Sequence, residues 1–525
     1  MRTGAGVTRT SRFIRGFASG YVHLMAAAVV GLWLTPFFLH RLGPDTYGLW
    51  LVGTQIIAYL LLMDLGVVAL LPREAAYVTG ATGRRDAPEL RGVVEQAFTL
   101  AAAQTPMVLM AAVLALRWMP ESWAALRLPL VVVLAVFIVT FPLRVFQAAL
   151  TGLQDLAFVA RAQFGAWTAG TVVNVVLVLQ GFGLPALAAG WCVTQLLTIG
   201  ACGVRLARAF PGAMPRRLHI GDARSTREYI ARSAWISVSQ VSQVLLNGTD
   251  VMVVAGLLGP AAVVPYVCTG KLIAVLANQP QAILQSAAPA LSELRSSGER
   301  DRLFSVSAAL SQATLAVSGL VACVILAVNG GFVAWWVGAE QYGGLMLTAL
   351  LLAAMIVRHF NTTNVYALFC FGHERRLALT GLADGVVTLA LSAAFIKLFG
   401  IAGAPLGAIA GVLLVGGPLN LAALSRETGV ARWRPITVLG PWFQRFVVML
   451  VLAGIAGVWI RPSTFVLLAA LGAAAGIFYA AVVVAPLLRS PAGVYLRPLI
   501  ARVQSARPAF ASRKGDGRVS VSVSE

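Results

Sequence analysis

The segment AQFGAWTAGTVVNVVLVLQGFGLPALAAGWCVTQLLTIGACGV, residues 162–204, runs for 43 residues without a charged side chain. A transmembrane helix needs about 20 predominantly apolar residues to cross the hydrocarbon core of a bilayer. The sequence Gly181-Phe-Gly-Leu-Pro185 interrupts the segment near its middle, and glycine and proline together mark a turn. The segment therefore predicts two membrane-spanning helices joined by a short turn.

The whole chain has the composition of a membrane protein. Of its 525 residues, 59% are hydrophobic and only 11% are charged, against about 25% charged residues in a soluble globular domain. Too little polar surface is present to cover water-soluble domains of this total length, so the composition excludes a soluble enzyme and a disordered chain. The five cysteines are scattered singly through apolar stretches, which excludes a disulfide scaffold and indicates small core residues.

Charge-free stretches recur along the chain and locate the other predicted spans. We predict an all-α polytopic membrane protein with fourteen transmembrane helices. The first of them is too long for a cleaved signal peptide. Their approximate ranges are 17–39, 47–70, 92–116, 128–150, 158–180, 184–207, 231–258, 262–286, 303–328, 343–370, 378–398, 401–424, 440–460 and 464–488.

The lysine and arginine residues fall almost entirely on one side of this arrangement. Of the 40, 32 lie before the first helix, in the loops after even-numbered helices or in the tail, whereas four lie in the opposite loops and four inside helices. Because basic loops stay in the cytoplasm, this asymmetry predicts cytoplasmic termini in a multi-pass protein of the cell inner membrane. A second interpretation of the basic clusters, such as residues 205–232, is binding to anionic lipid head groups.

Short motifs at nearly constant spacing indicate an internal repeat. Each repeat would contain six helices, an even number, so the two would be parallel lobes related by an axis along the membrane normal. Three matches carry this inference, with offsets of 216, 217 and 220 residues: Leu42-Gly43-Pro44 with Leu258-Gly259-Pro260, Phe182-Gly183 with Phe399-Gly400, and Thr151-Gly152-Leu153 with Phe371-Gly372-His373. The predicted parts are an N-lobe (1–208), a cytoplasmic linker (209–230), a C-lobe (231–425), a C-terminal helix pair (440–488) and a basic cytoplasmic tail (489–525).

Polar side chains in two neighbouring spans fall on one face of each helix. Asp250 and Lys271 lie at similar distances from the turn that joins these helices, which places both near the midplane. One interpretation is polar contact between helices, with a buried Asp250–Lys271 pair. The other is the wall of a wet cavity, with an ion- or proton-linked carboxylate and a cation for a substrate phosphate. The polar faces consist of Gln240, Gln243, Asn247 and Asp250 on helix 231–258, and of Lys271, Asn278, Gln281 and Gln285 on helix 262–286.

Three further ionisable residues lie inside predicted spans. Arg358 either pairs with Asp384 on the next helix or faces the cavity as a phosphate ligand. Asp64 lies near the inner end of its helix, where it either caps the segment that follows or couples an ion. Each of these residues is therefore a candidate for function as well as for structure.

No motif of an enzyme or of a nucleotide-binding protein is present. The chain has no P-loop, no glycine-rich dinucleotide motif and no Ser/His/Asp arrangement in a loop large enough to hold one. We therefore expect no catalytic residues, no metal site, no nucleic-acid partner and no cofactor. H⁺ and Na⁺ are the candidate coupling ions.

Two stretches of the sequence resemble a known family. The sequence LGPDTYGLW, residues 42–50, and the following Leu62-Met-Asp-Leu-Gly66 look like the opening of lipopolysaccharide and exopolysaccharide flippases of the MOP superfamily, the O-antigen flippase type. The run from Thr249-Asp-Val251 through Leu258-Gly259 to Tyr266, with Lys271 shortly after it, resembles the corresponding pattern of the second lobe. The resemblance covers the whole chain through its two six-helix lobes and extra helix pair.

The resemblance implies a function in cell-surface polysaccharide biosynthesis. Flippases of this family transfer a polyprenyl-pyrophosphate-linked oligosaccharide from the inner to the outer leaflet by alternating access, through a cationic cavity between the lobes. Membrane lipids, a glycan polymerase and other assembly proteins are the expected partners. The expected cavity residues are Lys271, Arg358, Asn247, Asn278, Gln240, Gln243 and Gln281, with Asp250 and Asp64 as ion-coupling candidates.

Two alternative functions stay open. A multidrug and toxin extrusion antiporter resembles this fold but has twelve helices, and the cations inside the spans disfavour a cationic drug as substrate. A membrane glycan polymerase needs a sizeable outer loop to bind sugar, and no such loop is predicted. Both alternatives are therefore weaker than the flippase.

Overall fold

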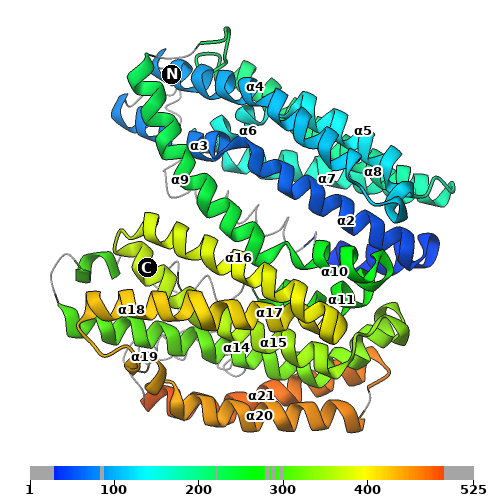
Figure 1. Cartoon of the computed structure of the whole chain (residues 1–525), viewed down its shortest axis with the longest axis vertical. Helices are drawn as coiled ribbons and strands as arrows, with labels where there is room; N and C mark the ends of the chain where they lie inside the picture. The colour runs from blue at the N-terminus through cyan, green and yellow to red at the C-terminus, as the bar shows by residue number, and fades with distance from the viewer. Residues whose placement is uncertain are drawn as a thin grey trace, which may run out of the picture.

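The computed structural model is helical throughout, and the residues that it describes contain no β-strand (Figure 1). These residues are 29–82, 88–219, 222–277, 291–295, 299–460 and 462–489, with the single residues 26, 284 and 493. The predicted all-α class is therefore confirmed. The basic N-terminal segment and nearly all of the predicted tail lie outside the described residues.

The first half of the chain begins with a helix over Val29–Leu42. It is followed by α2 (Pro44–Leu60), α3 (Val67–Thr82), α4 (Pro88–Arg117), α5 (Ala124–Thr140), α6 (Arg144–Gly152), α7 (Leu156–Leu179) and α8 (Leu184–Ala209). The predicted spans 47–70 and 128–150 are each broken, which corrects the prediction of continuous helices. The first breaks at Leu65 and Gly66, which both have positive φ. The second breaks before Pro142, whose ring nitrogen has no N–H to donate.

The second half of the chain contains further helices, several of them broken. The predicted span 231–258 bends by 48° between α9 and α10, and a five-residue π-helix, Val412–Gly416, joins α17 to α18. The helices are α9 (Ala223–Asn247), α10 (Asp250–Leu258), α11 (Val263–Thr269), α12 (Lys271–Leu276), α14 (Arg300–Val337), α15 (Gly344–Cys370), α16 (Glu374–Phe399), α17 (Gly403–Gly411), α18 (Gly417–Thr428), α19 (Arg434–Thr437), α20 (Gly440–Ile460) and α21 (Phe465–Arg489).

The number of membrane spans can be compared with the predicted fourteen only in part. Within the described ranges, ten helical stretches are long and apolar enough to cross a membrane, and the bent pair α9–α10 adds an eleventh. One of the ten, Glu374–Thr428, folds back at Gly400, so that α16 and α17 pack side by side. Val29–Leu42 and Pro260–Leu276 are shorter apolar helices. A count of fourteen stays a prediction.

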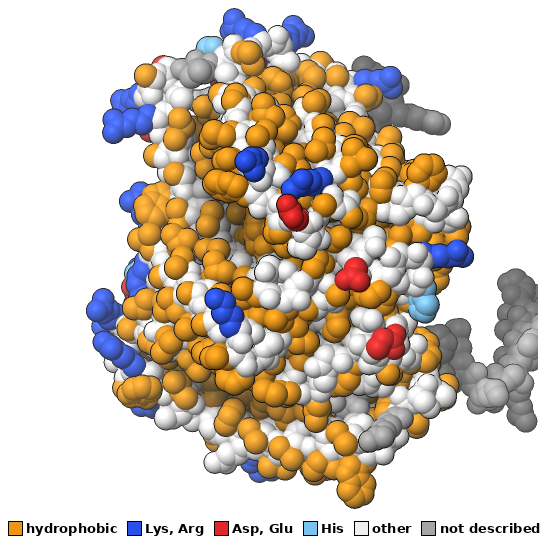
Figure 2. Space-filling view, turned by 45° about the vertical axis from the view of Figure 1, so that its right-hand side comes forward, with side chains coloured by type: hydrophobic (Ala, Val, Ile, Leu, Met, Phe, Trp, Pro, Cys, Tyr) orange, Lys and Arg blue, Asp and Glu red, His pale blue; other side chains and the backbone are white. Residues whose placement is uncertain are grey.

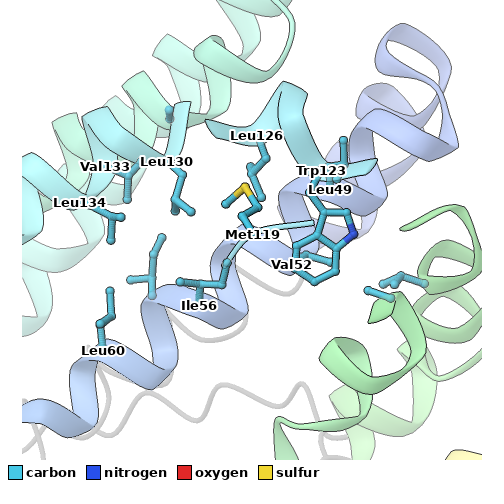
Figure 3. Close-up of a cluster of buried hydrophobic side chains, with 14 of the residues drawn as sticks. Leu49, Val52, Ile56, Leu60, Met119, Trp123, Leu126, Leu130, Val133 and Leu134 are labelled. Carbon is cyan, nitrogen blue, oxygen red and sulfur yellow. The ribbon is translucent and has the colours of Figure 1, made fainter. Parts of the chain in front are cut away.

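Apolar side chains from helices far apart in the sequence fill the interior. Figure 3 shows the cluster in which Leu49 and Val52 of α2 and Leu126 of α5 take part. Gly53 permits this close approach, because a Cβ at that position would lie 3.1 Å from Leu126 Cδ1. Many apolar side chains, such as Trp459, are exposed on the outer faces, as expected for a surface in contact with lipid.

Two groups of helices lie one above the other in Figure 1, with α9 running between them. Helices α2 to α8 form the upper group, and α14 to α18 with α20 and α21 form the lower group. Helix α9 packs along α16 and also contacts α3, whereas α10 and the short helix Pro260–Ala262 pack against α2. The two groups therefore meet along α9 and α10.

The backbone adopts matching conformations at two pairs of positions that the repeat predicts to be equivalent. Gly43 (φ 79°, ψ 164°) and Gly259 (φ 92°, ψ 162°) both precede a helix. Gly183 (φ 62°, ψ −135°) and Gly400 (φ 61°, ψ −146°) form a second such pair. Glycine adopts these conformations far more readily than other residues, so the turn geometry explains why glycine occurs at both members of each pair.

The third predicted match holds only in a shifted register. After α6, the N–H of residue 153 donates to the carbonyl four positions earlier, that of residue 154 to the carbonyl three positions earlier, and that of residue 155 to the carbonyl five positions earlier. Residues 371, 372 and 373 repeat this pattern in the same order after α15. Gln154 and Gly372 both have positive φ. The geometry thus aligns Gln154, rather than Gly152, with Gly372. The relation of the two lobes by an axis along the membrane normal stays a prediction.

Positive charge gathers at one end of the helices, where several Lys and Arg side chains stand along the left-hand edge of Figure 2. Helices α8 and α18 end there with Arg208 and Arg426 in their last turns. Arg232 of α9 and Arg375 of α16 lie near the starts of helices at the same end. We call this the basic end; its assignment to the cytoplasm stays a prediction.

Candidate functional site

A cavity of about 720 Å³ lies where α9, α15 and α16 meet, with α3 and α18 also contributing to its wall. It extends along α16 from Glu374, at the basic end, to Asp384. Ten residues of helix correspond to about 15 Å at a rise of about 1.5 Å per residue. The cavity therefore reaches roughly halfway across a hydrocarbon core about 30 Å thick.

Three arginines from three helices surround the basic end of this cavity: Arg73 of α3, Arg232 of α9 and Arg375 of α16. Arg232 Nη1 lies 2.7 Å from Glu74 Oε1. The guanidinium of Arg375 lies over the ring of Trp235, 5.5 Å from its centroid, where the negative face of the indole attracts a cation. These contacts hold two long, flexible side chains at the mouth of the cavity.

Arg73 is held by the hydroxyl of Tyr77, to which its Nε and Nη2 each donate a hydrogen bond at 3.4 Å. It lies beyond the candidate span Pro44–Asp64, and these hydrogen bonds raise the pKa of Arg73 above its ordinary value. Arg73 therefore stays positively charged at physiological pH. The two carboxylates that line the cavity are divided, with Glu374 at the mouth and Asp384 at the deep end.

Asp384 and two asparagines form the deep end of the cavity. Asn420 Nδ2 donates to Asn361 Oδ1 at 2.9 Å, and Thr388 Oγ1 donates to Asp384 Oδ1 at 3.2 Å. Gly416 of the π-helix passes directly over this cluster, because a Cβ there would overlap Asp384 Oδ2 and lie 3.0 Å from Asn361 Nδ2. Single π-helical turns within α-helices occur frequently at functional sites. The close packing at this end therefore depends on the glycine.

The wall between the mouth and the deep end is divided into polar and apolar parts. Hydroxyl and amide groups suit a ligand rich in hydroxyls, and the apolar part suits a hydrocarbon chain. The polar part includes Ser239, Ser242, Gln243, Asn361, Thr380 and Asn420, and the apolar part includes Leu70, Ile236, Leu246, Val365 and Phe369. This arrangement can bind an anionic group at its mouth and a polar, uncharged group more deeply.

The predicted polar face of α9 is described only in part. Gln243 lines the cavity. Gln240 is half-buried, and its Oε1 has no hydrogen-bond partner in the described part of the chain. Asn247 is the last residue of α9, and its side chain is not described; Asn278 and Gln281 lie outside the described residues. One of these five predicted residues is therefore placed in the cavity.

The predicted Asp250–Lys271 pair is not formed. Asp250 is the first residue of α10 and accepts a hydrogen bond from the Tyr266 hydroxyl at 2.8 Å. Lys271 is half-buried at the start of α12, and no ion pair joins it to Asp250 among the residues described. The pair was one of two interpretations of these residues, and it assumed that helix 231–258 is continuous. This helix instead bends by 48° after Gly248, and Asp250 bonds to Tyr266.

Arg358 of α15 lies between the two carboxylates that sequence analysis considered. It acts electrostatically on Asp250 and on Asp384, but within the described ranges it forms no ion pair within 4.0 Å with either. Its neighbour His359 is buried, and its Nδ1 shares a hydrogen bond of 2.7 Å with the Ser318 hydroxyl. Among the described residues, Arg358 thus pairs with neither carboxylate and does not line the cavity, while His359 has a structural contact.

Asp64 lies at a buried junction of broken helices, outside the cavity. Its Oδ1 accepts the Gly66 N–H at 2.9 Å, and Arg144 Nη2 lies 3.6 Å from its Oδ2. Arg144 begins α6, and Gly66 packs against the backbone carbonyl of Ser233 in α9. Asp64 therefore holds the turn between α2 and α3, which is the capping role; ion coupling at Asp64 stays a prediction.

Sequence analysis did not select the three arginines at the mouth. It assigned Arg73, Arg232 and Arg375 to membrane topology, because they belong to the basic segments at the ends of spans. One signal was available, since Arg232 precedes Gln243 by eleven residues, about three helical turns, and so lies on the same face of its helix. No comparable signal marks Arg73 or Arg375, because their helices must pack beside α9 before their side chains meet.

The described residues show no group of three or more His, Cys, Asp or Glu side chains that could hold a metal ion. Asp384 has asparagine and threonine neighbours rather than further carboxylates. The functional interpretation of the cavity therefore depends on arginines, amides and hydroxyls.

Comparison with known proteins gives the same fold at low sequence identity. No protein-family model and no curated protein sequence matches the chain. Among solved structures, the lipid II flippase MurJ in an inward closed conformation superposes with a TM-score of 0.64 at 10% identity, over 92% of this chain and 99% of that one. An inward-facing multidrug resistance MATE family transporter of the MOP superfamily superposes with a TM-score of 0.54 at 13% identity, over 75% of this chain and 94% of that one.

A third structure has the same architecture and a title that suggests a different function. It is a MOP superfamily transporter from Pyrococcus furiosus whose title states that the reverse polarity of its binding pocket suggests a different function. It superposes with a TM-score of 0.52 at 14% identity, over 81% of this chain and 99% of that one. The fold expected from the sequence resemblance is confirmed: this chain has the fold of the MOP superfamily of flippases and transporters.

Proposed function

We propose that this protein is a flippase for a lipid-linked oligosaccharide, and that it moves polyprenyl-pyrophosphate-linked glycan units from the inner to the outer leaflet. The observation that carries the proposal is the cavity with three arginines at its mouth and amides and hydroxyls along its depth. The mouth supplies ligands for a pyrophosphate, the polar wall suits a glycan, and the apolar wall suits part of a prenyl chain.

The physical need for such a cavity follows from the cost of moving charge through hydrocarbon. A pyrophosphate diester carries about two negative charges, and each charge costs several kcal/mol or more in the bilayer core. Arginine lowers this cost efficiently, because its planar guanidinium forms two parallel hydrogen bonds with phosphate oxygens. Arg73, Arg232 and Arg375 come from three helices, so together they can surround one anionic group.

The comparisons support this class of function and an alternating-access mechanism. MurJ is named as a lipid II flippase, and MATE family transporters are known in inward-facing and in outward-facing conformations. In this chain, the Arg232–Glu74 ion pair and the Gly66–Ser233 contact join α9, which packs along α16 of the lower group, to the upper group. Breaking and remaking these contacts would open and close the cavity at the basic end.

Several finer points belong to the same proposal. The basic end faces the cytoplasm of a cell with an inner membrane, and the glycan unit serves surface polysaccharide synthesis alongside a glycan polymerase. H⁺ or Na⁺ drives the cycle, with Asp250 and Asp64 as candidate coupling residues. Lys271 and Arg358 are candidate phosphate ligands for the later part of the path, beyond the three arginines of the mouth.

The test is complementation of a deletion strain with a variant that replaces Arg73, Arg232 and Arg375 with Gln. Each lost charge-assisted hydrogen bond is worth about 1.5–3 kcal/mol, so surface glycan on a gel should fall by at least about tenfold while membrane abundance stays normal. The matched control is Arg224→Gln, because Arg224 lies on the same helix, has an 89% exposed side chain and does not line the cavity. Normal glycan from a normally abundant triple variant would refute the proposal.

A second variant set separates the mouth from the later path. Replacing Lys271 and Arg358 with Gln should also reduce glycan, because both are then needed after the pyrophosphate leaves the mouth. Loss of protein together with loss of glycan would instead give these two residues a structural role. A complete surface glycan with this double variant would limit the phosphate ligands to the mouth.

Multidrug extrusion is the second candidate, favoured by the carboxylate of Asp384 at the deep end of the cavity and by the MATE transporters among the structural matches. A carboxylate can attract a cationic drug, in contrast to a pyrophosphate. Expression of the chain in a drug-sensitive strain discriminates between the two functions. Drug resistance that is lost with Asp384→Asn would support extrusion, whereas unchanged sensitivity with an Asp384-dependent glycan phenotype would support the flippase.

A further inference from the structure

A separate polar pocket of about 460 Å³ lies at the basic end and shares no lining residue with the cavity described above. It lies where the last turn of α18 approaches the start of α14 and the end of α15. Its volume falls within the range of about 300–1,000 Å³ that is typical of small-molecule sites. Its lining consists of Ser292, Leu294, Arg295, Arg300, Leu303, Cys370, Arg426 and Glu427.

The charges that line this pocket do not balance. It contains three arginines and one glutamate, an excess of two positive charges. Glu427 is already engaged, since its Oε2 lies 3.4 Å from Arg295 Nε and its Oε1 lies 2.7 Å from His373 Nε2. Among the described residues, no carboxylate lies within ion-pair distance of Arg300 or Arg426.

A fourth arginine increases the imbalance. Arg376 of α16 lies close enough to Arg426 for the two positive charges to repel each other. Arg376 Nη2 donates to the Leu419 carbonyl, but its Nη1 is buried and has no hydrogen-bond partner in the described part of the chain. Like charges held together without a counter-ion destabilise a folded protein, so this group of guanidinium groups is suited to a bound anion.

The start of α14 adds to the attraction for an anion. Arg300 is the first residue of this 38-residue helix, Asp301 follows it in the first turn, and no side chain of the described residues caps the free N–H groups. The first N–H groups of a helix lack intrahelical partners and carry a partial positive charge. The pocket also has an apolar floor, formed by Leu303 and Cys370. Because Cys370 ends the candidate span Gly344–Cys370, the pocket lies at the depth where lipid head groups meet the hydrocarbon.

We propose that this pocket binds a phosphate ester, held by Arg300 and Arg426 and oriented by Arg295. Two sources share this chemistry: the head group of an anionic phospholipid and a soluble phosphate compound. The binding site is distinct from the transport cavity, so the proposal does not depend on the flippase function. A bound phosphate would join the start of α14 to the end of α18 through Arg300 and Arg426, and would thereby hold these two helices together at the membrane surface.

The test uses the full-length protein in nanodiscs of phosphatidylcholine, with or without added phosphatidylglycerol, and a separate titration with inorganic phosphate at constant ionic strength. The readouts are the thermal unfolding midpoint and the lipids retained in native mass spectrometry. The variant combines Arg300→Gln with Arg426→Gln. Loss of two charge-assisted contacts should weaken the apparent affinity by at least about tenfold.

The control variant is Arg302→Gln. Arg302 lies in the same first turn of α14 but pairs with Glu299 at 3.3 Å and does not line the pocket. The Arg302→Gln variant loses one positive charge at the same helix end but keeps every residue that lines the pocket. Its affinity for the phosphate probes should therefore stay close to that of the wild type. Arg300→Lys with Arg426→Lys keeps the charges, retains part of the affinity and serves as the test variant if the Gln pair fails to fold.

The two arms of the experiment also identify the source of the phosphate. Stabilisation by phosphatidylglycerol but not by inorganic phosphate assigns the pocket to a lipid head group, and stabilisation by inorganic phosphate assigns it to a soluble compound. Both results support the proposal when the Gln pair removes them. If neither probe stabilises the wild type, or if the Gln pair responds like Arg302→Gln, the proposal is overturned.

Discussion

Replacing Arg144 with Met should destabilise the protein strongly, because it leaves the carboxylate of Asp64 buried without its cation. The Asp64 side chain is 2% exposed, and Arg144 Nη2 lies 3.6 Å from it. Among the described residues, its other contact is a hydrogen bond from the Gly66 N–H. Removing one partner of a buried ion pair costs about 3–5 kcal/mol. The expected loss in the free energy of unfolding is therefore of that size.

A matched substitution isolates the effect of burial. Arg205 pairs with Asp155 at the shorter distance of 2.9 Å, but the two side chains are 41% and 18% exposed. An exposed pair contributes about 0–1 kcal/mol, and the contact of Arg205 with the Phe158 ring, 5.1 Å from its centroid, adds about 0.5–1 kcal/mol. Arg205→Met should therefore cost about 2 kcal/mol or less, although its ion pair is the shorter of the two.

The assay is denaturant unfolding of the purified protein in detergent, followed by tryptophan fluorescence, with thermal unfolding midpoints as a second measure. The double variant Asp64→Asn with Arg144→Met should recover about 1–3 kcal/mol relative to Arg144→Met alone, because no uncompensated charge is left. If Arg144→Met costs no more than Arg205→Met, Asp64 does not depend on Arg144 for its charge. The junction of the broken helices would then be held by the Gly66 hydrogen bond alone.

Two further predictions concern the contact between α9 and the upper helix group. Gly66→Ala should lower the unfolding midpoint by an amount equivalent to about 2 kcal/mol or more, because φ of Gly66 is +73° and the new Cβ would overlap the Ser233 carbonyl. The control is Gly80→Ala, whose new Cβ has nothing within 4 Å. It should leave the midpoint unchanged or higher in the same measurement. Arg232→Glu places two like charges where a 2.7 Å ion pair with Glu74 now lies, so it should increase hydrogen exchange in α3 and α9. The double variant Arg232→Glu with Glu74→Arg restores an ion pair of reversed polarity and should restore protection from exchange. Equal exchange in both charge variants would show that the ion pair does not hold the helices together.

The sequence alone predicted the helical class and most helix positions. The predicted spans 158–180 and 184–207 correspond to α7 (Leu156–Leu179) and α8 (Leu184–Ala209), and Gly43 and Gly259 mark turns with the same backbone geometry. These features are local. A span depends on hydropathy summed over about 20 residues, and a turn depends on the conformations that glycine and proline allow.

The candidate site could be predicted only in part. The polar spacing on α9 selected Gln243 as a candidate, because residues seven or eleven apart share a helical face. Gln243 lines the cavity, and its role in binding stays a prediction. The same reasoning paired Asp250 with Lys271, whereas Asp250 accepts its hydrogen bond from Tyr266. The bend between α9 and α10 produces no strong hydropathy signal, so sequence periodicity was followed across it.

The sequence by itself thus determined which segments are apolar helices and where most of them end, since both follow from the chemistry of neighbouring residues. Only the tertiary structure decided that Arg73, Arg232 and Arg375 surround one cavity and that Arg300 and Arg426 line one pocket. These arginines are separated by more than a hundred residues in the chain, and they meet only because α9 packs along α16 and because α18 ends beside the start of α14. Which helices pack together depends on the shape and burial of whole faces, and no single stretch of sequence contains that information.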